Sequence, residues 1–465
     1  MNPQRVIRAR QRSGMAMTLG VALLGAAWGA RAEQDGASLS RMEQRLNALE
    51  EEVRVLRQQI ADAKTTAAPA GGKAATNETS VLSVGSEGVA MKSADGNFQM
   101  RMGGLLQTDA RFFLHDNAAF RDTFLIRRAR PILEATVFQE FGFRLTPEFA
   151  GSSMVLLDAS AEWKRWPWLT FRAGKFKPPL GLELLQNDPD REFTEAAFTT
   201  ALMPNRDIGF QLGGSIPGGA LGYALGVFNG APDGSSTFET DLGDHKDAVA
   251  RVFAQPFRET NLPALRKLGV GVAGSIGKQE TTAATANLPG NKTPGQQTFF
   301  SYRPTGFSNG ERHRLVPQAD YFYGPFGLLG EYVIEEQTVF LGPVSDRLRH
   351  EAWQITGSWV LTGEEASYSG VNPKHPFHLP TGNWGAWEMV ARYHEFDADP
   401  AAFPKFADPA SAARAAAAWG VGLNWYLNRN VRMNLHYEQT RFEGGAASGA
   451  RPTERVIFTR LQLKY

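Results

Sequence analysis

The sequence predicts an all-β fold, a transmembrane antiparallel β-barrel of about 16 strands with a short N-terminal α-helical coiled coil. Three observations predict it: an amino terminus typical of export, segments in which apolar and polar residues alternate, and an aromatic residue at the end of the last such segment. Alternation is typical of a strand that has lipid on one face and water on the other. A closed barrel also satisfies every backbone hydrogen bond inside a membrane.

The first 32 residues have the pattern of a secretory signal peptide. Four arginines precede an apolar stretch from Met15 to Trp28, and the small residues Ala30 and Ala32 mark a cleavage site after Ala32. An uncleaved membrane anchor is the alternative, but this apolar stretch is too short to span a membrane comfortably. We therefore expect residues 1–32 to be removed and the mature protein to reach the outer membrane.

The composition argues against several classes of protein. With no cysteine, the chain has no disulfide framework, thiolate metal site or lipidated amino terminus. Removing residues 1–32 takes away five arginines and no acid, which leaves 44 basic against 48 acidic side chains and argues against a nucleic-acid partner. No catalytic motif is recognisable, and His375 and His378 form no metal-ligand pattern. We expect neither an enzyme nor a bound cofactor or metal.

Residues 33–64 are predicted to form a parallel coiled coil. Apolar residues recur there at alternating spacings of three and four: Leu39, Met42, Leu46, Leu49, Val53, Leu56 and Ile60. The flanking pairs Arg45 with Glu50 and Glu52 with Arg57 have opposite charges, as a parallel coil favours. A single amphipathic helix is the alternative. Residues 65–80, rich in Ala, Gly and Thr, are expected to be a flexible linker.

Residues 81–465 are predicted to form the barrel. In one segment the apolar Val431, Met433, Leu435 and Tyr437 alternate with Arg432, Asn434, His436 and Glu438, and the last segment, 455–465, ends on Tyr465. A soluble sandwich could show the same alternation, but the aromatic residues on the apolar face favour a membrane girdle. At roughly 20–25 residues per strand and connection, this length gives about 16–18 strands. Such a barrel encloses water, so the sequence predicts passive diffusion.

Several stretches resemble the phosphate-selective porin O and P family. They are residues 127–130 (RRAR), 149–151 (FAG), 173–183 (AGKFKPPLGLE), 204–212 (PNRDIGFQL), 226–230 (GVFNG), 361–364 (LTGE), 385–393 (GAWEMVARY) and 423–428 (LNWYLN), in order over most of residues 95–465. The resemblance implies a 16-stranded homotrimeric porin with a constriction loop folded inward after the third extracellular turn. It also implies an arginine ladder for small anions, with phosphate or polyphosphate as candidate solutes.

Strand parity predicts which arginines face the lumen. Leu133, Ala135 and Val137 are apolar, so the even-numbered positions of that strand face water. An arginine turned to the bilayer midplane costs ~2–4 kcal/mol, which favours the lumen. The predicted anion path is Arg128, Arg130, Arg144, Arg172, Arg392 and Arg432. Arg127 has the opposite parity and requires either an interfacial position or an irregular strand.

Guanidinium groups suit oxyanions because they stay charged and bind through a planar fork. The alternative is that the lumen arginines pair with lumen acids and bind nothing. The candidate acids are Glu148, Asp158, Glu388 and Glu438. A general or cation-preferring porin would then be expected.

The residues predicted for the constriction loop are Lys175, Lys177, Glu183, Asn187, Asp188, Asp190 and Arg191. Between Leu182 and Glu195 there are five acids and one base, and Ala196 stands where the family's loop arginine is expected. A net negative constriction would repel phosphate. Lys175 and Lys177 either form a cationic collar or neutralise these acids.

The expected surroundings are outer-membrane lipid and lipopolysaccharide. Residues 164–167 are predicted to form a periplasmic turn. The Gly- and Pro-rich stretches 281–310 and 397–417 are predicted to form extracellular loops. A different class of function is structural: the coil, ~33 Å long from Leu39 to Ile60, would extend toward peptidoglycan.

Overall fold

The computed structural model describes residues 80–114, 121–216, 218–236, 243–285 and 288–465, and seven residues between 47 and 58. Those seven are helical, and Arg54 pairs with Glu51 at 2.8 Å. The signal peptide, the linker and most of the coiled coil lie outside the described residues, so they stay predictions. The chain divides into two units, residues 1–77 and 78–465, and only the second is described further.

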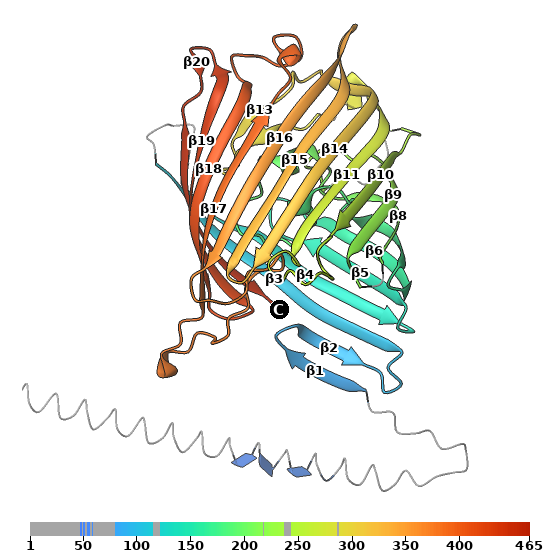
Figure 1. The fold of residues 1–465 in the computed structure, drawn as a ribbon, viewed down its shortest axis with the longest axis vertical. Helices are drawn as coiled ribbons and strands as arrows, with labels where there is room; N and C mark the ends of the chain where they lie inside the picture. Colours follow the sequence, from blue (N-terminus) through green and yellow to red (C-terminus); the bar gives the residue numbers. More distant parts are fainter. Residues whose placement is uncertain are drawn as a thin grey trace, which may run out of the picture. The chain divides into compact units, whose positions relative to one another are not determined.

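The second unit is a closed antiparallel barrel of 16 strands (Figure 1). Its strands are β3 (Phe98–Phe113), β4 (Thr123–Val137), β5 (Phe141–Glu148), β6 (Val155–Trp166), β7 (Leu169–Phe176), β8 (Asp207–Ser215), β9 (Leu221–Phe228), β10 (Asp247–Ala254), β11 (Leu268–Glu280), β14 (Phe307–Tyr323), β15 (Phe326–Leu341), β16 (Val344–Val360), β17 (Ala386–Asp397), β18 (Ala413–Tyr426), β19 (Val431–Ala446) and β21 (Glu454–Lys464). Each pairs with the next, and β21 closes the ring by pairing with β3.

The remaining elements are short. They are β1 (Val81–Gly85), β2 (Gly88–Lys92), β12 (Asn291–Lys292), β13 (Thr298–Phe300), β20 (Gly449–Ala450), α2 (Leu182–Leu185), η1 (Phe198–Leu202), η2 (Ala283–Thr285), η3 (Leu379–Thr381) and η4 (Pro400–Ala402). The hairpin of β1 and β2 adds to β3 through Gln99–Met102, outside the ring. Among the described residues, no helix is long and apolar enough to cross a membrane.

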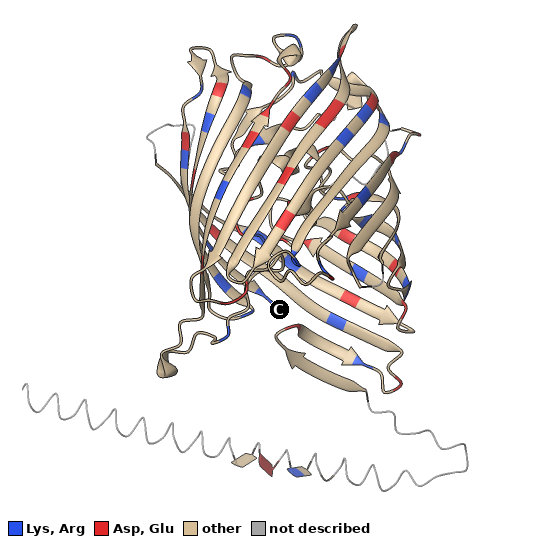
Figure 2. Ribbon diagram, in the orientation of Figure 1, with Lys and Arg blue, Asp and Glu red and all other residues tan. Residues whose placement is uncertain are grey.

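Side chains alternate between lipid and lumen as the sequence predicts. In β19, Arg432 and His436 are no more than 2% exposed on the lumen side, whereas Met433 and Leu435 are 42% and 53% exposed on the outer face. Figure 2 shows the charged residues distributed along the strands. The period of two therefore fixes the direction of most side chains.

Register shifts interrupt that alternation at several places in the barrel, and two of them, in β4 and β6, each turn a side chain inward. The register of β3 and β4 shifts between Gln107 and Thr108, so Arg127 is an extra residue and reaches the lumen beside Arg128. An irregular strand was one of the two possibilities for Arg127. A second shift, opposite Pro147, leaves Leu157 only 4% exposed, although in the sequence Leu157, Ala159 and Ala161 alternate with polar residues, a pattern that predicts the lipid face for Leu157.

The two rims of the barrel differ. The rim that carries Tyr465 has mostly short connections, and we call it the Tyr465 rim; the opposite one is the long-loop rim. The predicted stretches 281–310 and 397–417 lie at the long-loop rim but are shorter than expected, because β14 begins at Phe307 and β18 at Ala413. The long connection 361–385 lies at the Tyr465 rim, which the sequence did not indicate.

Apolar side chains fill part of the lumen near the long-loop rim. Phe198, Phe299, Phe300, Phe396 and Phe406 are each no more than 2% exposed and belong to one core. They come from the connections of the barrel and from the inner face of β17, so this core lies inside the ring. Water is therefore excluded from this part of the barrel.

Candidate functional site: the constriction and its vestibule

Residues 177–206 connect β7 to β8 and fold into the lumen; we call them the inward loop. Pro178 and Pro179 have no amide hydrogen to donate to a ladder, so the chain leaves the wall there. The loop then meets distant strands: the Leu182 amide donates to Glu331 at 2.6 Å, and Gln462 donates to the Pro189 carbonyl at 3.0 Å. Most residues of the loop are buried, and only Asn187 is exposed.

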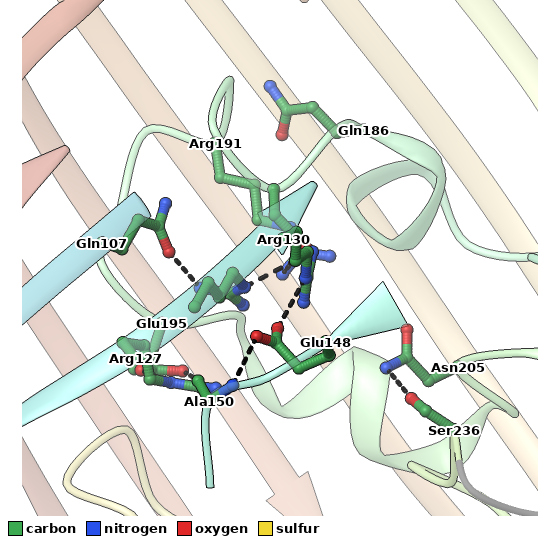
Figure 3. Close-up of polar contacts among 12 residues, drawn as sticks. Gln107, Arg127, Arg130, Glu148, Ala150, Gln186, Arg191, Glu195, Asn205 and Ser236 are labelled. Atoms are coloured by element: carbon green, nitrogen blue, oxygen red, sulfur yellow. Dashed lines mark hydrogen bonds and ion pairs between the residues drawn. The ribbon is translucent and has the colours of Figure 1, made fainter. Parts of the chain in front are cut away.

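Asp188 attaches the inward loop to β4. Its carboxylate lies 3.4 Å from Arg128 Nε, 3.0 Å from Arg191 Nη1 and in contact with Arg130. Arg130 also donates to Glu148 at 2.6 Å (Figure 3). Burial alone would raise the pKa of Asp188, but the three arginines hold that pKa well below its usual range. Asp188 is therefore an ionised anchor of the loop.

Glu195 is the second anchor. Arg127 Nε donates to it at 2.7 Å and Arg111 Nη2 at 2.9 Å, and Arg460 lies 3.5 Å away (Figure 3 shows Arg127 and Glu195). Burial opposes its ionisation, but Arg127, Arg460 and Arg111 lower the pKa of Glu195. Arg111 and Arg460 were missed by the sequence analysis, although strand parity, applied to β3 and β21, would have directed both inward.

The arginines of the β17–β19 wall lie behind the loop. Arg392 donates to Glu438 at 2.9 Å and to the Glu195 carbonyl at 2.8 Å, with its guanidinium 4.4 Å from the Phe193 ring centre. The Arg392 side chain is 0% exposed. Arg432 is 2% exposed and donates to the Tyr426 hydroxyl at 3.2 Å. Neither is open to a passing ion.

A polar cavity of about 1090 Å³ lies between the inward loop and the Tyr465 rim, and we call it the vestibule. Arg144 and Arg172 line it, with side chains 40% and 37% exposed. Each also pairs with an acid: Arg144 with Glu134 and Arg172 with Glu162, both at 2.8 Å. The floor includes residues 187–190 of the loop, and residues 369–372 form part of another side.

The acids of the inward loop are largely neutralised. Besides Asp188 and Glu195, Glu183 lies 3.5 Å from Arg392 and Asp190 lies 2.6 Å from Lys464. Glu192 makes no ion pair among the described residues, and burial, with Glu388 nearby, raises its pKa to about 8. Four of the five loop acids therefore lie within 4 Å of cations of the barrel wall, because the fold brings them into contact; whether the constriction repels anions stays a prediction.

Comparison with known proteins identifies the family. A model of the phosphate-selective porin O and P family matches residues 98–465. The chain belongs to this family. Its fold is shared by the outer membrane channel DcaP of Acinetobacter baumannii (10% identity, TM-score 0.52, 79% of this chain and 98% of that chain). It is also shared by OmpF of Salmonella typhi (9%, 0.52, 79% and 98%) and an anion-selective porin from Comamonas acidovorans (11%, 0.50, 79% and 100%).

No match was found among curated proteins. The family and the fold are those of outer-membrane porins, which are channels and not enzymes. The likeness to the solved structures concerns the fold alone, because their sequences are so different.

Both Lys175 and Lys177 were predicted for the constriction loop of this porin, but Lys175 lies in β7 and only Lys177 belongs to the inward loop. Lys175 is 3% exposed, and Lys177 Nζ donates to the Gln186 carbonyl at 2.7 Å. Burial lowers the pKa of Lys177 well below its usual value. Asn187 is the exposed residue of the loop and faces the vestibule. Lys177 thus bonds a backbone carbonyl of the loop, and the choice between a cationic collar and neutralisation of the loop acids stays a prediction.

The structure also places the two histidines of the sequence analysis. His378 Nδ1 lies 3.1 Å from the Thr381 hydroxyl, and His375 is exposed. In the part of the chain that the structure describes, no three His, Asp or Glu side chains are grouped to hold a metal ion.

Proposed function

We propose that this porin conducts small anions by passive diffusion, through the vestibule and past the inward loop, with phosphate or polyphosphate as candidate solutes. The observation that carries the proposal is the exposure of Arg144 and Arg172 on the vestibule wall. Lys164, at 55% exposure, lies near the Tyr465 rim and Arg130 lies beside the loop. Together the four cations form a path along β4–β7 that a hydrated oxyanion can follow.

Neutralisation of the loop acids supports the same proposal. Asp188 and Glu195 would oppose an anion if their charges were open to the lumen. Both are no more than 8% exposed and are held by arginines. An anion at the end of the vestibule therefore meets little uncompensated negative charge.

A general or cation-preferring pore is the competing function, because Glu134 and Glu162 accompany the exposed arginines. Reversal potentials of the purified porin in planar bilayers, measured in asymmetric KCl, separate the two. We expect an anion-selective potential and a chloride current that added phosphate blocks. Cation preference without a phosphate block would contradict the proposal.

We propose a homotrimer from the family resemblance, and the short strands of one wall, β7 to β10, are consistent with a subunit interface there. Strands β7 to β10 have only 8 or 9 residues. Tilted by ~45°, such strands span ~20 Å, less than the ~25 Å apolar band of an outer-membrane barrel. A neighbouring protomer would cover this wall. The mass of the porin in detergent tests the assembly, and a monomeric mass would contradict it.

We propose that the amino-terminal coil extends the chain toward peptidoglycan. We also propose that the long-loop rim of the barrel contacts lipopolysaccharide. Deleting residues 39–60 tests the coil. A change in oligomer mass or in envelope integrity is expected. If both are unchanged, the coil has no role in assembly or tethering.

A further inference from the structure

The connection 361–385 reaches two different environments. Its first part lies in the lumen: Ala366 and Val371 are buried against Tyr426 and Val360. Its second part is exposed, with Leu379 65% and Trp384 55% exposed. In Figure 1 this orange connection between β16 and β17 extends beyond the ends of those strands. We call residues 374–384 the tip.

The lumen part holds the inward loop. The Tyr368 hydroxyl donates to the Leu182 carbonyl, and Gln186 Nε2 donates to the Tyr368 carbonyl at 2.9 Å. These bonds join the two connections from opposite rims of the barrel. The position of the inward loop is therefore tied to residues 361–385.

The tip packs against the outer face of the barrel. Trp387 of β17 and Trp425 of β18 stack at 5.0 Å on that face. Phe377 lies edge-on to Trp425 at 5.4 Å, and the Trp425 indole donates to the Trp384 carbonyl at 2.6 Å. The aromatic surface of the wall thus continues directly into the tip.

The apolar outer face of β17 is shorter than the apolar band of an outer-membrane barrel. On the outer face of β17 the apolar positions run from Trp387 to Tyr393, and Glu395 and Asp397 follow. The six steps from Trp387 to Tyr393, at ~3.3 Å each and tilted by ~45°, cover ~14 Å, against an apolar band of ~25 Å. Glu395 and Asp397 end the apolar face of β17 on one side, so further apolar surface along this strand lies on the side of the tip.

We propose that the tip docks in the phospholipid interface of the membrane at the Tyr465 rim, with Leu379 and Trp384 among the lipids. Tryptophan favours this interface, where its ring is apolar and its indole N–H finds a partner. Residues 374–385 contain no acid, so nothing in the tip opposes lipid phosphates. Through Tyr368, the docked tip then restrains the inward loop, in addition to the ion pairs that anchor the loop to the wall.

The absence of cysteine makes the docking measurable without background labelling. A polarity-sensitive fluorophore would be placed on Leu379→Cys in liposomes, with Val421→Cys as the control on the outer face and Ser369→Cys as the control in the vestibule. We expect the Leu379 probe to be quenched by lipids brominated near the carbonyl end of the acyl chain. The Ser369 probe should stay unquenched. A Leu379 probe as unquenched as Ser369 would overturn the docking.

The link to the inward loop has its own test, in single-channel recordings. Leu379→Glu should expel the tip, and Tyr368→Phe removes the hydrogen bond to Leu182. Both should increase the fluctuation of the open-channel current, because each frees the same connection from one end. If either variant records like the wild type, the link is wrong. Neither test depends on anion selectivity, so the proposed function stands or fails separately.

Discussion

The wall of β5–β7 and the wall of β17–β21 both direct arginines into the lumen, but only the first leaves them exposed. Arg144 and Arg172 are 40% and 37% exposed, whereas Arg392 and Arg460 are 0% and 1% exposed. The inward loop covers the second wall and supplies acids and carbonyls to its arginines. Strand parity thus decides which side of the barrel an arginine faces, and loop docking decides whether it binds the loop or meets the solute.

The largest effect is expected from Arg392→Ala on the covered wall. The substitution leaves Glu438 buried without its guanidinium partner, and removing one member of a buried pair costs about 3–5 kcal/mol. The free energy of unfolding in urea measures this loss. Arg172→Ala on the open wall is the matched control, for which ~0–1 kcal/mol is expected. Equal losses in the two variants would show that the walls do not differ.

The open wall should control selectivity. Arg144→Gln and Arg172→Gln each remove one exposed charge from the vestibule while keeping a polar side chain. At ~0.5–1 kcal/mol per charge, the ratio of anion to cation permeability should fall about two- to fivefold in each variant. Reversal potentials give this ratio. An unchanged ratio in both variants would remove these arginines from the anion path.

The smallest effect is expected from Glu192, which lies in the inward loop beside Glu388 and Asn424 of the covered wall. Because its pKa is raised from 4.5 to about 8, the docked loop holds the proton more tightly than an exposed glutamate does. The contribution of Glu192 to loop docking is therefore complete at low pH. It decreases as the pH rises above 4.5 and is lost once the pH passes about 8. Below 4.5 the group is neutral in either position, so no further gain is expected.

Above that pKa the loop carries a negative charge beside Glu388, so anion permeability should fall, by about twofold or less. Currents recorded at about pH 6 and about pH 9 measure the change. Glu192→Gln should make the permeability independent of pH in this range. A variant that keeps the full pH dependence would assign it to another group.

Much of the fold could be predicted because the residue types along a strand alternate with the environment, lipid or water, that each side chain faces. Met433 and Leu435 alternate with Arg432 and His436 in the sequence, and they face lipid and lumen in the structure. The length of the chain predicted about 16–18 strands, and the family resemblance implied the family and the inward loop. Even the bulge at Arg127 was one of two predicted possibilities, since an arginine on the lipid face is costly.

The partners of the loop could not be predicted, because they come from distant parts of the chain. Counting charges between Leu182 and Glu195 indicated a repulsive constriction, yet Arg111, Arg127 and Arg460 meet at Glu195. No local pattern encodes that meeting. The same holds for Tyr368, whose connection was not recognised as part of the site.

The sequence by itself determined the barrel, its two-faced strands and the inward direction of the arginines, because lipid and water select residues one position at a time. Only the tertiary structure decided that Arg392 anchors the loop and that Arg144 stays open to the vestibule. The physical reason is that exposure depends on which loop covers a side chain, and loop docking is fixed by charge pairs formed across the lumen.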